Sequence, residues 1–477
     1  MLNRLWRWLL NNEALVLLLL LAVILRLPSL FEPYWYGDEG IYLVLGQAFN
    51  QGLIWYRDIH DNKPPLLYLL AAFTGTVFWF RLLLTVWFGA TIVVFYRLMK
   101  RLLPQVPAAA NLATLLLILL TTIFEGNIAN AEIFFILPIS AAVLLALGKK
   151  PAYLTIGFLF ALAFLFKIPA AFDFLALLLW LIIWKKLAFK NLLLAGLSFA
   201  LPIIGTIIYY ADKGAMIPYV RSALLQNVGY LSSWEGSQNG LWIRLAVVSG
   251  FLVIFIPLAK KFKLSAAAGL AVIWFTWAMF GALLSERPYP HYLIQPAVPL
   301  TILLAFFVFG KRKLLKLVIT AAVILAGLAY YQIRFWQYPI FGYYQNFIEF
   351  SLGKKSPDQY WNWFDPRVTQ TYQLAKYIRT TTLPNEPIFI WGDEPYVYAL
   401  SGRLPVGRYT VAYHVVDFNG FKETMTAWDK RQPKLVVVMT YETRPFPALS
   451  ARLAADYALV TTLDQAKVYR RLNGATP

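Results

Sequence analysis

The sequence contains no cysteine, and only 14% of its 477 residues are charged. The absence of cysteine excludes disulfides, thiolate catalysis and cysteine-ligated metals. With 60% hydrophobic residues, a soluble protein of this length could not cover its apolar surface with so few charges. The composition therefore indicates a polytopic α-helical membrane protein.

Histidine and acidic residues are also scarce. The three histidines, His60, His291 and His414, are too scattered to suggest a zinc site by spacing alone. Basic residues outnumber acidic ones by 43 to 24, but they lie in short clusters between apolar runs. Such clusters orient a protein in the membrane, so the net charge of +19 does not indicate nucleic-acid binding.

Apolar runs bounded by charge predict the membrane spans, each of about 20 residues. A polar loop, and not a small-residue cleavage site, follows the first run, which is therefore expected to be an anchor and not a removed signal peptide. The run at 66–80 ends at Arg81 and is expected to be a short helix near the outer face. The expected crossings are residues 13–30, 82–99, 107–124, 131–147, 152–166, 168–184, 191–210, 241–258, 264–284, 292–309 and 314–333.

Basic clusters predict the orientation of these spans. If all of them lie on the cytoplasmic side, the N-terminus is cytoplasmic and the C-terminal part is extracytoplasmic, in a multi-pass protein of the cytoplasmic (inner) membrane. A full crossing by residues 66–80 would force one cluster outward, which leaves the number of transmembrane helices at about 11–13. The clusters are Arg4/Arg7, Lys100/Arg101, Lys149/Lys150, Lys185/Lys186/Lys190, Lys260/Lys261/Lys263 and Lys311/Arg312/Lys313/Lys316.

Polar side chains gather on the outer face in this topology. That face receives the loop at 38–63, EGNIANAE at 125–132, Lys167, the loop at 212–240 and SERPYPH at 285–291. The inner face receives little besides lysine and arginine. The asymmetry predicts that chemistry or binding takes place outside.

From about residue 336 the composition becomes that of a soluble domain. Residues 368–382 have helical spacing, and PIFIW at 387–391 and KLVVVMT at 434–440 are typical of buried strands. The chain is therefore expected to have two domains, a transmembrane domain at 1–335 and an extracytoplasmic soluble α/β domain at 336–477.

The first outer loop, 31–65, carries the densest group of ionisable side chains. Asp38 and Glu39 follow the first span, and this acid pair could act as a general base, bind a metal or cap the following helix. His60 and Lys63 could bind phosphate, although a lysine here also suits snorkelling at the interface. The density of charge favours a catalytic site at the membrane surface.

Basic and tyrosyl side chains recur in later outer segments. Arg287, His291 and Tyr292, in SERPYPHY, suit a phosphate clamp, or an interfacial aromatic belt with an arginine anchor. Lys167 lies between two apolar runs and is expected to be functional, unless it snorkels at a short helical hairpin. Both features predict binding of an anionic group.

A second acidic segment is EGNIANAE, which contains Glu125 and Glu132. It suits a solvated turn, or a second acidic site that binds an acceptor or a metal. No clear metal triad accompanies it, so the sequence leaves dependence on a divalent metal open.

Five motifs follow one another along the chain: DEGIYL, HDNKPPLLY, ANAE, FKIP, and RPYPHY before a helix. Taken together, these motifs resemble the polytopic GT-C glycosyltransferases, and within them the bacterial and archaeal protein mannosyltransferase and aminoarabinose transferase group (glycosyltransferase family 39-like). The resemblance covers residues 1–335, and WGDEPYVYALSGRLPVGRY at 391–409 is similar to a segment in the outer domain of many bacterial members.

The resemblance implies a donor in which a sugar is linked to polyprenyl phosphate. The family's first-loop acid falls on Asp38, the expected general base, with Glu39 beside it in acceptor or sugar binding. A single base and an in-line attack imply inversion at the anomeric carbon. The residues that would hold the lipid phosphate are Lys63, Lys167, Arg287, His291 and Tyr292.

Two other classes of function compete with this one. A transporter or flippase of lipid-linked glycans would place ionisable groups near the bilayer midplane and often shows repeated halves, whereas the sequence shows neither. A sugar-binding scaffold could carry the same loops without catalysis. The sequence also leaves the acceptor open among a glycan, a lipid and a protein.

Overall fold

The structure, a computed structural model, describes residues 12–226, 240–285 and 287–472. The chain divides into two compact units, each built from several segments. Unit 1 contains Met1–Ser29, Arg81–Ile208 and Leu224–Ile340, and unit 2 contains Leu30–Phe80, Tyr209–Ala223 and Phe341–Pro477. The basic cluster Arg4/Arg7, residues 227–239 of the loop at 212–240 and Glu286 lie outside the described residues.

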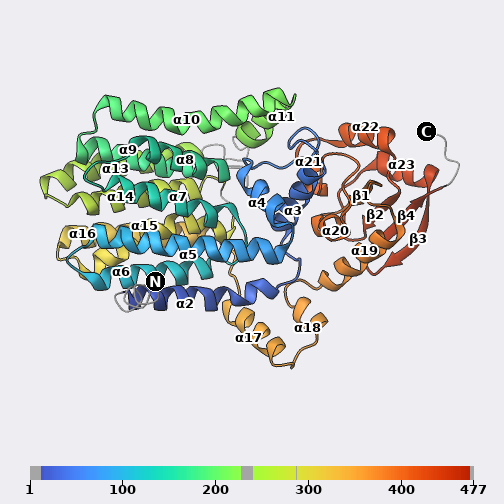
Figure 1. The fold of residues 1–477 in the computed structure, drawn as a ribbon, viewed down its shortest axis with the longest axis horizontal. Helices are drawn as coiled ribbons and strands as arrows, with labels where there is room; N and C mark the ends of the chain where they lie inside the picture. The colour runs from blue at the N-terminus through green and yellow to red at the C-terminus, as the bar shows by residue number, and fades with distance from the viewer. Residues whose placement is uncertain (1–11, 227–239, 286, 473–477) are drawn as a thin grey trace, which may run out of the picture. The chain divides into compact units, whose positions relative to one another are not determined.

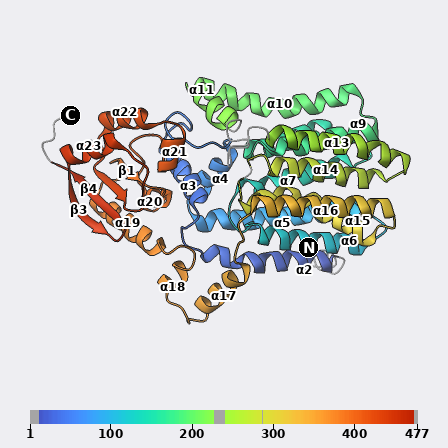
Figure 2. The ribbon, with the colours of Figure 1, turned by 180° about the vertical axis from the view of Figure 1, so that it is seen from behind.

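Unit 1 is a helical bundle whose long helices run alongside one another (Figures 1 and 2). Helix α14 packs against α9 and α15, α15 also packs against α6, and α7 packs against α8. The elements of this unit are α2 (Glu13–Arg26), η1 (Leu27–Phe31), α5 (Val77–Leu102), α6 (Pro107–Ile123), α7 (Ala131–Ala146), α8 (Tyr153–Phe166), α9 (Ala170–Lys185), α10 (Phe189–Asp212), α13 (Gly240–Lys261), α14 (Ala266–Ala282), η3 (Pro290–Leu293), α15 (Ile294–Phe309) and α16 (Lys313–Ile333).

Several of these helices have the properties of membrane spans. Among the described residues, six helices are long and apolar enough to cross a bilayer. In α10, α13 and α16 only 11% of the apolar window is buried, so their apolar side chains face outward. Such faces would be unfavourable in water and suit lipid. The chain is a multi-pass membrane protein.

Each expected crossing has a matching helix, while the number that cross and their sidedness remain predictions. The short helix expected at 66–80 is observed in part as α4 (Leu66–Thr74), whose nine residues rise only about 14 Å and are capped by the left-handed Gly75. Residues 77–80 of the expected range belong to the next helix, and the place of α4 near the outer face stays a prediction. The expected start of the next span at residue 82 is wrong, because α5 begins at Val77 and runs through Arg81. The helix tolerates Arg81 because its buried guanidinium donates to the carbonyl of Ser29 at 3.1 Å.

Unit 2 joins the first loop to the C-terminal part of the chain. It holds a four-stranded sheet with α-helices around it (Figure 1). Its elements are α3 (Gly37–Asn50), α4, α11 (Met216–Tyr219), η2 (Val220–Leu225), α17 (Ile340–Ser351), α18 (Pro357–Trp361), α19 (Val368–Thr381), β1 (Ile388–Trp391), α20 (Pro395–Ser401), α21 (Ala412–Asp417), α22 (Phe421–Arg431), β2 (Leu435–Met439), α23 (Pro447–Asp456), β3 (Tyr457–Leu463) and β4 (Ala466–Arg471).

The sheet has the strand order β1-β2-β4-β3. Strands β1 and β2 are parallel, with Ile388 opposite Leu435, and β4 is antiparallel to both of its neighbours. The strands expected at 387–391 and 434–440 are confirmed as β1 and β2, and the helix expected at 368–382 as α19. The sheet makes this part of the chain an α/β structure.

Helix α3 is packed on both sides within unit 2. Gly40 faces α20 so closely that a Cβ atom there would lie 2.9 Å from Cγ of Pro395. Gly46 faces α4 even more closely, since a Cβ atom there would lie 2.6 Å from the backbone nitrogen of Ala72. The side chain of Gln47 donates to the carbonyl of Ala399 at 2.7 Å. The C-terminal part of the chain therefore helps to fix the helix that begins with the predicted catalytic acids.

Candidate active site

The acid pair Asp38-Glu39 lies in the first turn of α3. The Asp38 side chain is 32% exposed, whereas Glu39 is fully buried. Tyr42 follows Asp38 by one helical turn and donates its hydroxyl proton to Asp38 Oδ2 at 2.9 Å. Burial and the adjacent Asp38 carboxylate raise the pKa of Tyr42, so its hydroxyl remains a donor. Of the two acids, only Asp38 is open to a substrate.

Lys63 lies between two carboxylates. Its Nζ is 3.6 Å from Asp38 Oδ2 and 3.7 Å from Asp61 Oδ2. The hydroxyl of Tyr68 donates to Asp61 at 2.7 Å, and the amide of Lys63 donates to that same hydroxyl at 2.9 Å. We refer to Asp38, Tyr42, Asp61, Lys63 and Tyr68 as the acid site. It combines an accessible carboxylate with a fixed cation.

His60 lies away from the solvent-facing side of this loop. It is 1% exposed, and its ring packs against those of Tyr409, His414 and Phe418. Its Nδ1 is 3.3 Å from Ser222 Oγ. Burial lowers the pKa of His60 well below its usual value, so the ring is neutral at pH 7. In this structure His60 therefore offers no charge to a phosphate.

A second group of polar residues lies in unit 1. We call it the Lys167–His291 cluster, and it consists of Glu125, Glu132, Lys167, His291 and Tyr292. Lys167 stands in extended backbone between α8 and α9. Its ammonium forms an ion pair with Glu132, at the start of α7, and lies 4.0 Å from the centre of the Tyr292 ring. The lysine is thus held by a charge and an aromatic face at once.

Glu125 and His291 form a second pair in the Lys167–His291 cluster. His291 Nδ1 lies 3.1 Å from Glu125 Oε2, and both side chains are buried. Arg287, in the segment before η3, is partly buried, and its amide lies 3.4 Å from Ser285 Oγ. The structure therefore places each acid of the EGNIANAE segment against a residue expected to bind phosphate.

Three residues in or beside the acid site had no role predicted from the sequence alone. Tyr42 could have been found, because residues four apart share a helix face. Asp61 belongs to HDNK but carried no assigned role. His414, whose Nε2 is 3.8 Å from Asp61 Oδ1, comes from α21 and shares no motif with the first loop.

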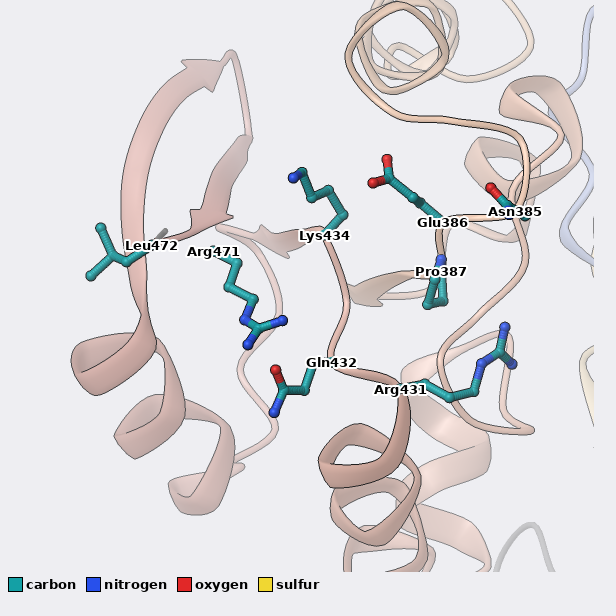
Figure 3. A pocket seen from close by; sticks show the side chains of 8 residues that line it. All are labelled: Asn385, Glu386, Pro387, Arg431, Gln432, Lys434, Arg471 and Leu472. Atoms are coloured by element: carbon teal, nitrogen blue, oxygen red, sulfur yellow. The ribbon is translucent and has the colours of Figure 1, made fainter. Parts of the chain in front are cut away.

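Unit 2 also contains an open pocket of about 410 Å³ (Figure 3). It lies where the chain enters β1 and β2, beside Pro387 and Lys434, and Figure 3 shows Arg431 and Arg471 at its other edges. None of the residues predicted to be functional lines this pocket. Among residues 12–226, 240–285 and 287–472, no group of three or more His, Cys, Asp or Glu side chains is placed to hold a metal ion.

No family model matches the sequence, and no curated protein matches it. Two crystal structures of ArnT from Cupriavidus metallidurans, however, resemble the structure. The ArnT structure bound to undecaprenyl phosphate has a TM-score of 0.60 at 14% identity, over 97% of this chain and 99% of that one. The apo structure has a TM-score of 0.58 at 14% identity, over 97% and 98% of the two chains. The likeness shows that this chain has the GT-C fold.

Proposed function

We propose that this chain is a membrane glycosyltransferase that transfers a sugar from a polyprenyl-phosphate donor to an acceptor at the outer face of the cytoplasmic membrane. The shared fold supports the class of enzyme, and the undecaprenyl phosphate bound to ArnT supports the class of donor. The observation that carries the proposal is the pairing of Asp38 with Lys63 at 3.6 Å, because it sets a base beside a cation.

Asp38 is the general base in this proposal. An acceptor hydroxyl becomes a good nucleophile only as its proton leaves, and the accessible carboxylate of Asp38 receives that proton. The acceptor oxygen forms a bond to the anomeric carbon while the bond from that carbon to the phosphate oxygen breaks. The phosphate departs with the electron pair, and attack from the opposite face inverts the anomeric configuration.

In this proposal Glu39 has a structural role, unlike Asp38. Since it is fully buried, it cannot reach an acceptor directly. Its charge raises the pKa of nearby Tyr34, after the larger effect of burial on that hydroxyl. We assign Glu39 to the support of the loop that carries Asp38.

The cations are assigned to the phosphate of the donor. Lys63 serves in the acid site, where its ammonium would stabilise the charge that develops on the leaving group. In unit 1 the same task falls to Lys167, His291 and Arg287, with Tyr292 as the aromatic support of Lys167. Glu132 is the counter-ion of Lys167, and the carboxylate of Glu125 lies against the ring of His291. A lysine that already has a carboxylate partner is held in place before the donor arrives.

The test is release of polyprenyl phosphate by the purified protein in detergent, from a panel of polyprenyl-phosphate sugars, with membrane extract as the source of acceptor. Asp38→Asn should lower the rate by about 10²–10⁴-fold, the usual contribution of a general base. Lys63→Gln should lower it as well. Lys434→Gln makes the same change in the pocket of Figure 3 and should leave the rate unchanged. A parallel reaction with EDTA tests dependence on a divalent metal.

The outcomes separate the classes of function. Release by wild type and none by Asp38→Asn supports both the donor class and the base. Equal release by both would keep the enzyme but remove Asp38 as its base. No release by wild type from any donor would contradict the proposal and favour a transporter, which moves the lipid-linked sugar without cleaving it.

A further inference from the structure

Asp61 is buried at the centre of the acid site, yet the proposed reaction gives it no task. The side chain is 1% exposed. Its Oδ2 accepts a hydrogen bond from Tyr68 at 2.7 Å and lies 3.7 Å from Lys63 Nζ. Its Oδ1 faces His414 Nε2 at 3.8 Å. A buried carboxylate is unfavourable unless other groups compensate its charge, and here three separate elements supply them.

His414 is the partner that the C-terminal part of the chain provides. It lies on α21, is 2% exposed, and packs against the rings of both His60 and Phe418. The helix is fixed at its start, where the amide of Tyr413 donates to Asp393 Oδ1 at 3.0 Å. The imidazole can therefore move little, and Nε2 is the nitrogen that faces Asp61.

The charges around His414 come from two parts of unit 2. Asp61, Lys63 and Asp38 face it from the first loop, and Asp393 from the segment after β1. Burial is the largest effect and lowers the pKa of His414 to about 4, so the ring is neutral at pH 7. A neutral ring with its proton on Nε2 points an N–H group toward the Asp61 carboxylate without adding a second cation.

We propose that Asp61 is the lasting counter-ion of Lys63 during the reaction, and that His414 is a positioning residue that holds Asp61 in that role. The inference rests on the proposed function. When Asp38 takes the acceptor proton, it loses its negative charge, and Lys63 loses one of its two carboxylate partners. Asp61 then keeps the ammonium fixed while negative charge grows on the departing phosphate. The segment around α21 thus becomes part of the machinery that positions Lys63.

The first experiment compares kcat, the donor KM and the pH–rate profile of several variants. Asp61→Asn and His414→Leu should each lower kcat about tenfold or more with little change in donor KM, because the lost interaction matters most as charge develops. His414→Gln should recover much of the loss, since its amide N–H can replace Nε2–H. Val415→Ala is the matched control, because Val415 is equally buried on α21 and packs in the hydrophobic core of the sheet.

The control should lower the melting temperature but leave kcat and the pH profile unchanged. If His414→Leu behaves like Val415→Ala in every measurement, His414 has only a structural role and the inference is wrong. If Asp61→Asn raises donor KM and spares kcat, Asp61 belongs to ground-state binding and the proposed role is also wrong.

A second experiment does not depend on turnover. The rate at which an N-hydroxysuccinimide ester acylates Lys63 is measured by peptide mass spectrometry, with the more exposed Lys213 of the same unit as reference. Loss of a buried counter-ion should make Lys63 of Asp61→Asn react several-fold faster, while Lys213 is unchanged. If wild type releases no polyprenyl phosphate, the proposed function fails on that result alone. Equal acylation of Lys63 in both proteins would overturn the pairing with Asp61 in either case.

Discussion

Gly40 of α3 and Pro395 of α20 approach so closely that a Cβ atom on the glycine would lie 2.9 Å from the proline Cγ. The ring of Tyr396 lies 3.0 Å from the same point. The start of α3, where Asp38 lies, is therefore packed directly against a helix that follows β1. A glycine is required here by lack of space and not by backbone conformation.

Gly40→Val should destabilise the protein and lower its activity. Overpacking of this kind costs about 1–3 kcal/mol, because α20 or α3 must shift to admit the methyl groups. Gly37→Val is the matched control in the same helix, since nothing lies within 4 Å of a Cβ atom at Gly37. Thermal unfolding in detergent measures both. Equal melting temperatures would show that α3 and α20 separate easily, contrary to the packing described here.

Much of the fold follows from local pattern, and the sequence predicts it for that reason. Long apolar runs predicted the helices of unit 1, and the short apolar runs IFIW and LVVVM predicted the buried strands β1 and β2. Strands β3 and β4 escaped prediction because only three of their residues are buried and their residues are mixed in polarity. Arg81 was taken to end an apolar run, since its burial against a carbonyl depends on tertiary contacts.

The acid site was predictable only in part. The charges of DEGIYL and HDNK marked Asp38 and Lys63, and the structure pairs them. The contact of Asp61 with His414 joins segments separated by most of the chain, and no local spacing encodes such a pair. The neutral state of His60 is likewise a product of burial, which the sequence around it does not reveal.

Acid should destabilise unit 2 through its buried histidines. Burial lowers the pKa of His60 and of His414, the latter to about 4 from 6.5. Below pH 6.5 the unfolded chain therefore binds protons that the folded chain does not. The stabilisation is complete above about pH 6.5 and is lost as the pH falls toward 4, by on the order of 3 kcal/mol for His414.

His60→Phe tests this prediction, because the aromatic neighbours of His60 suit a phenyl ring. The melting temperature of the variant should fall less than that of wild type between pH 7.5 and about pH 4.5. Carboxylates titrate in the same range and lower stability in both proteins, so the difference between the two curves is the relevant quantity. Parallel curves would mean that burial does not lower the pKa of His60 in the folded protein.

Lys167 and Glu132 should behave as a coupled pair. Removal of one partner leaves the other charge in a largely buried place, with side chains 17% and 4% exposed, so Lys167→Gln and Glu132→Gln should each destabilise strongly. The double variant should lose less than the sum of the two single losses, since it leaves no unpaired charge. Melting temperatures of the four proteins form the cycle. Additive losses would show that the two side chains do not interact.

Asp173 links α9 to two other helices of unit 1. Its Oδ1 accepts from Trp274 Nε1 at 2.6 Å, and its Oδ2 accepts from Gln295 Nε2 at 2.6 Å. Gln295 lies one turn beyond His291 and Tyr292, and Asp173 lies shortly after Lys167. These bonds therefore tie together two of the three segments that carry the Lys167–His291 cluster. Asp173→Leu removes both acceptors from buried donors, at a cost of about 1–3 kcal/mol for each donor left unsatisfied.

Asp173→Asn separates hydrogen bonding from charge at this position. The asparagine carbonyl can still accept from Trp274, and a rotated Gln295 amide can accept from the asparagine nitrogen. This variant should therefore keep most of the melting temperature and most of the polyprenyl phosphate release, whereas Asp173→Leu should lose both. If Asp173→Asn is as inactive as Asp173→Leu while both remain folded, the carboxylate charge itself acts in the reaction, and the role of Asp173 is more than to hold α9, α14 and α15 together.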